Sequence, residues 1–327
     1  MKFQKFFLTG VAGFIGSNLL EVLLEAGHEV IGIDNFSTGS QTNLDHVKDK
    51  VGKKWKNFKF FEMDLALLKE DVLNDNSLGV TCCIHLAALG SVPRSIDNPI
   101  NTNNANIQGF LNILDFARRQ KLDKFIFASS SSVYGDNSNL PKIENEIGSP
   151  LSPYALTKRV DEMYAEVFDK VYNYPTIGLR FFNVFGPRQN PDGDYAAVIP
   201  RWLKAMKENT EINIFGDGET TRDFCYIQNA IEAIMLAVRT ELKTHEIFNV
   251  AVGAQTSLNT IADTIKKELS IYGIKYSKEF NYVDFRAGDV RASEADITKA
   301  KITLGYDPKI RCLDGIKEYV KDNMLRN

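Results

Sequence analysis

The sequence has little cysteine, with four residues in a chain of 327. Their spacing is not that of a metal site, and two of them are adjacent within the apolar run VTCCIHLAA, which is typical of a buried strand. We therefore expect free core thiols in a protein of a reducing compartment, with no metal. The four are Cys82, Cys83, Cys225 and Cys312.

The sequence also lacks long apolar runs and blocks of basic charge. The N-terminal stretch MKFQKFFLTG has no signal-peptide pattern, and no segment approaches the length of a membrane span. The formal net charge is -3, with Lys and Arg scattered among Asp and Glu, so no surface for nucleic acid or anionic lipid is indicated. We expect a cytoplasmic protein with a small or nucleotide-sized partner, and neither a nucleic acid nor a membrane as partner.

What is present is an alternation of strand-like and helix-like segments. In the first half, apolar runs such as KFFLTG alternate with amphipathic patterns such as FIGSNLLEVLLEAG, whose helix should run from about residue 14 to 26. This predicts an α/β fold, a Rossmann-type doubly wound parallel sheet with a smaller α/β substrate-binding lobe, because the rhythm breaks after residue 180. The predicted nucleotide-binding domain comprises residues 1–180 and 217–250, and the lobe comprises residues 181–216 and 251–327.

The segment TGVAGFIG, residues 9–16, lies between the first predicted strand and the first helix. Gly10 suits a tight turn, Gly13 lets the backbone approach a diphosphate, and Gly16 allows the helix to pack closely on the strand. The diphosphate would then lie at the helix N-terminus, where free N–H groups favour negative charge. The segment therefore predicts a dinucleotide site.

Asp34 ends the second predicted strand, eighteen residues after Gly16. A carboxylate there would accept hydrogen bonds from ribose hydroxyls and repel a 2′-phosphate, and the following NFSTG offers no Arg to accept one. NAD is therefore favoured over NADP. The alternative interpretation makes Asp34 an ordinary turn residue. Asp64, after the third strand, could similarly face the adenine.

The segment SPYALTK opens a further helix, with Ser152 as its N-cap and Pro153 at its first position. Tyr154 and Lys158 then lie on one face at i and i+4. The ammonium would stabilise a phenolate and lower the pKa of the Tyr, which makes a usable general base. The alternative interpretation is a pair of side chains on a helix surface.

Four serines, residues 129–132, follow the apolar run KFIFA. They therefore begin at the carboxyl end of a central parallel strand, where open α/β sheets bind ligands. A Ser there could hold a substrate hydroxyl against the Tyr and share its proton. The alternative interpretation is a solvated turn.

Together these features resemble the extended short-chain dehydrogenase/reductase family over essentially the whole chain. More narrowly, the sequence resembles nucleotide-sugar 4-epimerases, and among them the bacterial UDP-N-acetylglucosamine 4-epimerases. The segments that carry the resemblance are HLAALGSVPRSIDNP, SSSSVYGD, SPYALTK, LRFFNVFGPRQ, YAAVIPRW, GDGETTRDFCYI and RAGDVRASEADITKA.

The resemblance implies reversible 4-epimerisation of UDP-N-acetylglucosamine to UDP-N-acetylgalactosamine, with weaker action on UDP-glucose and UDP-galactose. Tyr154 would take the proton of the sugar 4-hydroxyl while hydride leaves C4 for tightly bound NAD, and hydride would then return to the other face of the 4-keto sugar. Ser130, four residues before Tyr134, matches the family's catalytic hydroxyl, and Ser131 is the adjacent candidate. Dehydrating relatives carry an Asp-Glu pair at Ser131 and Ser132, so the hydroxyls here argue against dehydration.

The resemblance also implies two sets of binding residues. Those for NAD are Gly10, Gly13, Phe14, Ile15, Gly16, Asp34, Asn35, Ser37, Thr38, Gly39, Asp64, Leu65, Ala87, Ala88, Asn106, Tyr154, Lys158 and Phe181. Those for the UDP-sugar are Gly90, Ser91, Ser130, Ser131, Tyr154, Asn183, Ala197, Val198, Asn213, Phe215, Arg222, Arg286, Asp289 and Ser293. Some of them have structural alternatives: an Arg222–Asp223 ion pair, a turn role for Asp289 and a core role for Phe215.

Ser293 is the position most informative about the sugar. By resemblance, epimerases restricted to UDP-glucose carry a bulky Tyr there, so a Ser leaves room for an acetamido group, which Gly90-Ser91 could hydrogen-bond. The resemblance further implies a homodimer through helices that contain residues 100–118 and 153–170.

Two alternative functions stay open. One is a noncatalytic nucleotide-binding protein, against which the intact Ser130, Tyr154 and Lys158 weigh. The other is a sibling 4-epimerase for UDP-glucuronic acid, which would need a cation near the C6 carboxylate, and Arg94 is its candidate.

Overall fold

The computed structural model describes residues 4–68, 70–74, 77–192, 196–285 and 290–325. Strands and helices alternate through its first half, as the sequence predicts. The elements there are β1 (Lys5–Thr9), α1 (Phe14–Glu25), β2 (Glu29–Asp34), α2 (Gln41–Val51), β3 (Phe58–Glu62), α3 (Glu70–Asn74), β4 (Val80–His85), α4 (Val92–Asp97), α5 (Pro99–Asn103), α6 (Gly109–Arg119), β5 (Lys124–Ser130), α7 (Pro153–Tyr172) and β6 (Ile177–Phe181). Short 3-10 turns η1 (Gly52–Asn57), η2 (Leu65–Leu67) and η4 (Ser131–Tyr134) and a π-helical turn, η3 (Asn104–Gln108), lie between them.

Seven strands form the main sheet in the order β11-β6-β5-β4-β1-β2-β3, with β11 at Glu246–Val250. The pairs from β5 to β3 are parallel, which confirms the predicted doubly wound sheet. The chain moves outward from β1 in both directions, so the strand order reverses beside β1. Ligands of open α/β sheets bind at the carboxyl ends of the strands at such a point.

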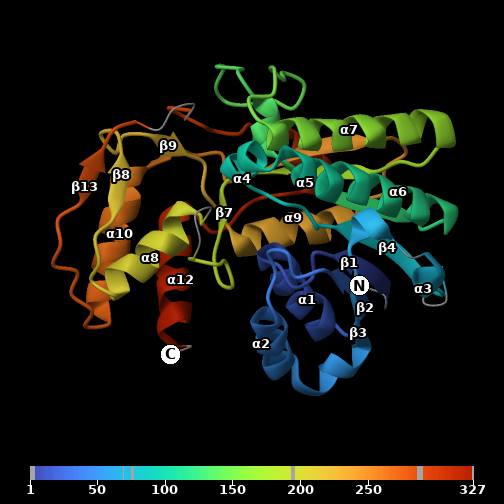
Figure 1. Cartoon of the computed structure of the whole chain (residues 1–327), viewed down its shortest axis with the longest axis horizontal. Coiled ribbons are helices and arrows are strands. Elements are labelled where there is room, and N and C mark those ends of the chain that lie inside the picture. Colours follow the sequence, from blue (N-terminus) through green and yellow to red (C-terminus); the bar gives the residue numbers. More distant parts are fainter. Residues whose placement is uncertain (1–3, 69, 75–76, 193–195, 286–289, 326–327) are drawn as a thin grey trace. The chain divides into compact units, whose positions relative to one another are not determined.

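The two faces of this sheet are covered by different helices. Alternate side chains of the strands point to opposite faces, and Phe7, Cys83 and Phe127 pack in one cluster with Phe110 of α6 and Phe168 of α7. Figure 1 shows α5, α6 and α7 side by side over that face, with α1 on the other. Ala165 and Phe168 of α7 belong to this cluster, which holds the helix against the sheet.

The remaining elements are short strands and longer helices. They are β7 (Val184–Phe185), α8 (Val198–Lys207), β8 (Asn213–Phe215), β9 (Thr221–Arg222), β10 (Cys225–Tyr226), α9 (Ile227–Arg239), β12 (Thr256–Ser257), α10 (Leu258–Ile271), β13 (Asn281–Val283), α11 (Thr298–Leu304) and α12 (Cys312–Leu325). The short strands make three two-stranded pairs, β7 with β10, β9 with β12 and β8 with β13. The four cysteines are free and buried, as the sequence analysis expected.

Backbone contacts divide the chain into two compact units. Unit 1 comprises Met1–Asn137, Ile147–Arg180 and Ala233–Phe248, and unit 2 comprises Ser138–Glu146, Phe181–Glu232 and Asn249–Asn327. Residues 138–146 and 217–232 therefore group with unit 2, whereas the sequence prediction placed them in the nucleotide-binding domain. The reason is pairing: β9 and β10 bond to strands of unit 2, and Lys142 bridges to Ala295.

Candidate active site

The glycine turn leaves no room for side chains where it meets the sheet. Gly10 has φ +69°, and a Cβ there would lie 2.7 Å from the nitrogen of Ala87, which follows β4 in the chain. A Cβ on Gly16 would lie 2.0 Å from the Gly10 oxygen. Gly13 begins α1 without a side chain, and the first turn, at Phe14 and Ile15, carries no acidic residue. The free N–H groups of α1 therefore form a site suited to a diphosphate.

Asp34 faces this turn from the end of β2. Its Oδ2 accepts a hydrogen bond from the Ala12 N–H at 2.9 Å, and its Oδ1 accepts one from the Phe36 N–H at 2.8 Å. The side chain is mostly buried, and burial raises the pKa of Asp34 although these backbone N–H groups oppose the rise. A carboxylate fixed beside a dinucleotide turn fits the ribose of NAD and opposes the added charge of a 2′-phosphate.

The loop after Asp34 folds back onto the glycine turn. Asn35 Oδ1 accepts hydrogen bonds from the backbone N–H and the hydroxyl of Ser37, at 3.0 and 2.7 Å. A Cβ on Gly39 would lie 2.7 Å from the Ala12 carbonyl carbon, so this close approach requires glycine. Ser37 and Thr38 are exposed, where they can meet a ligand.

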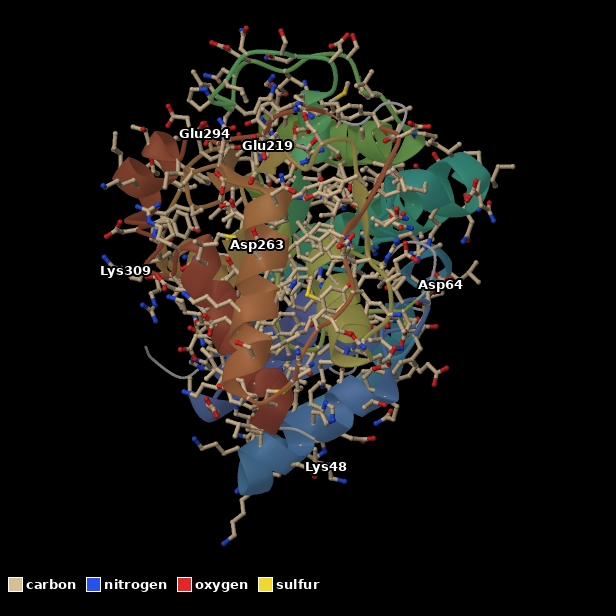
Figure 2. All side chains as sticks on the ribbon, turned by 90° about the vertical axis from the view of Figure 1, so that its left-hand side faces the viewer. Lys48, Asp64, Glu219, Asp263, Glu294 and Lys309 are labelled. Carbon is tan, nitrogen blue, oxygen red and sulfur yellow. The ribbon has the colours of Figure 1, made fainter. Side chains whose placement is uncertain are left out.

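Asp64 and Asn106, both predicted to bind NAD, have structural partners. Asp64 is exposed at the margin of unit 1 (Figure 2), and its Oδ1 accepts from the Ala66 N–H at 2.9 Å, capping the turn that contains the buried Leu65. Asn106 is buried in the π-helical turn, where its Oδ1 accepts from the Leu89 N–H at 2.8 Å. Its amide also donates to the Thr157 hydroxyl at 3.0 Å, so it ties the loop after β4, which includes Ala88, to α7.

Helix α7 begins as the sequence predicts and carries the reactive pair. Ser152 caps it by accepting from the Ala155 N–H at 3.1 Å, and Pro153 follows at the first helical position. Lys158 is 2% exposed, so it is not the surface residue of the alternative interpretation. Its ammonium donates to the Ala128 carbonyl of β5 at 3.0 Å, which fixes it under the end of that strand.

Gly90 brings the loop after β4 to the same place. A Cβ on Gly90 would lie 3.8 Å from the Tyr154 hydroxyl, so the absence of a side chain keeps the space beside that hydroxyl open. The next residue, Ser91, caps α4 by accepting from the Arg94 N–H at 3.3 Å. Arg94 lies in α4, the short helix that follows the predicted acetamido-binding pair.

The four serines that follow the apolar run have different surroundings. Ser129 is buried and donates to Glu162 Oε1 at 2.6 Å, so it is part of the core. Ser130 caps η4 by accepting from the Ser132 N–H at 3.1 Å, and the Ser132 hydroxyl lies 3.0 Å from the Ser130 hydroxyl. Ser130 and Ser131 are half-buried at the carboxyl end of β5, on the side of the sheet where ligands bind.

A buried ion pair beneath these residues was missed by the sequence analysis. Arg180 of β6 donates to both oxygens of Glu162, at 2.8 and 2.9 Å, and each side chain is at most 2% exposed. Arg159 adds a bond at 3.2 Å. Burial opposes ionisation of Glu162, but the bonds from Arg180 and Ser129 hold its pKa below the usual range. The pair braces α7 against the sheet.

The carboxylate next to it, Asp161, was also missed. It is fully buried, and its Oδ2 accepts from the Lys158 ammonium at 3.1 Å. Burial raises the pKa of Asp161 to about 7, although Lys158 opposes the rise. The spacing of the sequence could have indicated that Asp161 is buried. Residues 158, 161 and 162 follow Tyr154 on the helix face that also carries Ala155 and Ala165.

Most of the predicted sugar-nucleotide residues lie in unit 2. Ser293 bonds to β9 next to Arg222 in the sequence, because the Ser293 N–H donates to the carbonyl of Thr221, the other residue of that strand, at 3.2 Å. Asp223 is buried and accepts from the N–H groups of Val252, Gly253, Ala254 and Ala295. Burial raises the pKa of Asp223 to about 6 against these bonds.

The other predicted positions in unit 2 are dispersed over its strands and one helix. Asn213 and Phe215 begin and end β8, Ala197 caps α8 and Val198 begins it, Asn183 has φ +28°, and Phe181 ends β6. Arg286 and Asp289 lie outside the described residues.

The profile of the NAD dependent epimerase/dehydratase family matches residues 6–251, most of the chain. The chain belongs to this family. NAD is therefore its cofactor, and the glycine turn, the uncapped start of α1 and Asp34 are the described features that fit NAD.

Three solved structures resemble the chain over nearly its whole length. A UDP-glucose 4-epimerase from Thermotoga maritima, with UDP-glucose, is 35% identical at a TM-score of 0.88, with 99% of each chain covered. A UDP-N-acetylglucosamine 4-epimerase from Methanobrevibacter ruminantium, in complex with UDP-N-acetylmuramic acid, is 33% identical at 0.89, with 100% of each chain covered. A UDP-glucuronic acid 4-epimerase from Bacillus cereus, in complex with UDP-glucuronic acid and NAD, is 31% identical at 0.84, covering 98% of this chain and 100% of its own.

Among the described residues, no group of three or more His, Cys, Asp and Glu side chains is arranged to hold a metal ion. No helix in this part of the chain is long and apolar enough to cross a membrane.

Proposed function

We propose that this protein is a UDP-sugar 4-epimerase and that it interconverts UDP-N-acetylglucosamine and UDP-N-acetylgalactosamine. The observation that carries the proposal is the group in unit 1: the Tyr154 hydroxyl beside Gly90, with Lys158 anchored on the Ala128 carbonyl. This group follows a dinucleotide turn in a family described as NAD dependent.

The residues of the chain have distinct roles in the proposed reaction. Tyr154 removes the proton of the sugar 4-hydroxyl and later returns one, since the oxidised sugar has a carbonyl there. Lys158 stabilises the phenolate by its charge, because a cation nearby favours the ionised form of a Tyr. Ser130 holds the same sugar oxygen by a hydrogen bond. NAD, when bound, supplies the acceptor and donor of hydride at C4.

The serines after β5 favour epimerisation over loss of water. Expelling a hydroxyl requires a general acid near the leaving group, and Ser131 and Ser132 provide hydroxyls instead of carboxyls. The Ser132 hydroxyl lies within hydrogen-bond distance of Ser130, so it supports the group that holds the substrate oxygen. The proposed reaction therefore ends at the epimer.

Two features support an acetamido sugar. Ser293 is small and half-buried, and it lies in the segment that contacts β9 next to Arg222, a candidate for the diphosphate. Gly90 and Ser91 lie in the loop that borders the Tyr154 hydroxyl, where a polar contact to the substituent at C2 would favour this sugar. Arg286, Asp289, Asn183, Asn213 and the Ala197-Val198 backbone complete the proposed uridine diphosphate site.

UDP-glucuronic acid is the second candidate substrate. Arg94 lies in the Ser91-capped start of α4, and a guanidinium near the sugar would pair with the C6 carboxylate. The Bacillus cereus relative named for that sugar gives this candidate further support. The substrate comparison below distinguishes it from the first.

We also propose a homodimer through α4, α5 and α7. Helix α7 exposes an apolar stripe at residues spaced like one helix face, and the end of α4 and the start of α5 add one apolar side chain each. The stripe, called the α7 stripe below, comprises Leu156, Met163, Val167, Val171, Ile96 and Ile100, which are 49–75% exposed. Contact with a second copy would remove this surface from water.

The proposed function is tested by incubating the purified protein, without added NAD, with three substrates in turn. These are UDP-N-acetylglucosamine, UDP-glucose and UDP-glucuronic acid, with the 4-epimers resolved by chromatography. The proposal expects fastest conversion of the acetamido sugar, reduced about 10²–10⁴-fold by Tyr154→Phe, as for loss of a general base. Preferred conversion of UDP-glucuronic acid would select the second candidate, and no conversion of any, with NAD supplied, would overturn the function.

A further inference from the structure

Two buried carboxylates adjacent in sequence, Asp161 and Glu162, have opposite surroundings. Both oxygens of Glu162 accept bonds from Arg180, and Ser129 and Arg159 add more. Asp161 has one bond, from the Lys158 ammonium to Oδ2, while its buried Oδ1 has no partner among the described residues. A buried carboxylate that is only half satisfied destabilises a core, so a structural role explains Glu162 but not Asp161.

The Lys158 ammonium is what connects Asp161 to the reactive group. It is 2% exposed and donates to Ala128 on one side and Asp161 on the other. At this buried position, the negative charge of an ionised Asp161 lies 3.1 Å from the ammonium of Lys158. It therefore cancels much of the electric field that the ammonium exerts on its surroundings. Tyr154, one helical turn before Lys158 on the same face, lies within that field.

We propose that Asp161 is a positioning residue, which holds Lys158 in place and sets how strongly Lys158 stabilises the Tyr154 phenolate. An ionised Asp161 weakens the pull of the ammonium on the phenolate, and a neutral Asp161 restores it. This assigns a third side chain to the Tyr154 and Lys158 pair, and its use in catalysis rests on the proposed function.

Of the three buried groups Asp161, Glu162 and His85, Asp161 is the one that changes charge near neutral pH. Glu162 faces Asp161 from the same helix and stays ionised, because Arg180 and Ser129 hold its pKa low against burial. His85 of β4 faces Lys158 and stays neutral, because burial and the ammonium lower its pKa to about 3. Burial raises the pKa of Asp161 to about 7.

The test measures the ionisation of Tyr154 directly. Ultraviolet titration of the purified protein with its NAD, minus the same titration of Tyr154→Phe, gives the pKa of this one phenol without any substrate. In the Asp161→Asn background the pKa of Tyr154 should fall by up to roughly one unit, the effect of a unit charge about 10 Å away at an effective dielectric constant of about 20. Asp161→Ser, a smaller neutral acceptor, should give the same shift if the Asn variant folds poorly.

Glu166→Gln is the matched control, because it removes the same charge from an exposed position of α7 paired with Lys170. It should move neither the phenol titration nor the pH profile of kcat/KM, whereas Asp161→Asn should move the acidic limb of that profile to lower pH. An unchanged Tyr154 pKa in both Asp161 variants would overturn the inference even if the protein is an epimerase. A shifted pKa in a protein that converts no UDP-sugar would leave the inference standing and remove the proposed function.

Discussion

At the scale of single residues, the chemistry of the site depends on where each hydroxyl lies. Four consecutive serines look equivalent in the sequence, yet Ser129 is committed to Glu162 and Ser130 caps the turn that follows β5. Ser130 keeps its position because the Ser132 N–H and hydroxyl both meet it. Substituting Ser129 should therefore affect folding, while substituting Ser130 should affect turnover.

Ser293→Tyr tests the specificity argument at one position. A bulky phenol should exclude the acetamido group, so the rate on UDP-N-acetylglucosamine should fall about 10–100-fold while the rate on UDP-glucose stays within a few-fold, the discrimination that a reshaped pocket wall can supply. Steady-state kcat/KM on both sugars is the measurement, and Ser293→Ala is the control that keeps the space. Equal losses on both sugars would contradict the assignment of Ser293.

At the scale of elements, α7 is held to the sheet by charge as well as by apolar packing. Glu162→Gln leaves the buried Arg180 guanidinium without its ion partner, which typically costs about 3–5 kcal/mol. Urea denaturation at neutral pH should show this loss in the free energy of unfolding. Glu166→Gln removes an exposed ion pair with Lys170 on the same helix, and it should change the free energy of unfolding by about 0.5 kcal/mol or less.

The same pair predicts a pH dependence. The folded-state pKa of Glu162 lies below its unfolded value, so the stability that Glu162 provides is present above that unfolded value, about 4.3, and is lost as pH falls through the folded value. The difference between wild type and Glu162→Gln should therefore shrink below about pH 4. A constant difference across this range would show that the ion pair is not its source.

The sequence predicted those parts of the site that local spacing determines. The glycine turn, Asp34 at a strand end and the N-capped start of α7 each depend on neighbours a few residues away. The Glu162–Arg180 pair joins residues of α7 and β6, which are distant in the sequence. Two consecutive carboxylates are typical of a solvated helix face, so only the packing of α7 in the folded protein shows that they are buried. Residues 217–232 group with unit 2, and not with the predicted nucleotide-binding domain, for a similar reason, since β9 bonds to β12 far along the chain.

At the scale of the whole molecule, the α7 stripe predicts the oligomeric state. Met163→Glu combined with Val167→Glu puts two charges into the proposed interface, so the dimer should dissociate into folded monomers. Sedimentation velocity at several concentrations measures this. Ile302→Glu, which charges a side chain 80% exposed on α11, is the control and should stay dimeric. A wild-type monomer at all concentrations would contradict the interface.

In the proposed reaction, the sugar is inverted by oxidation and reduction at C4 within one site. The most direct measurement uses UDP-N-acetylglucosamine carrying deuterium at C4, incubated in ordinary water, with the product analysed by mass spectrometry and NMR. The UDP-N-acetylgalactosamine formed should keep its deuterium at C4, and Tyr154→Phe should form little product of either kind. A product whose C4 deuterium has exchanged with solvent would contradict the proposed reaction.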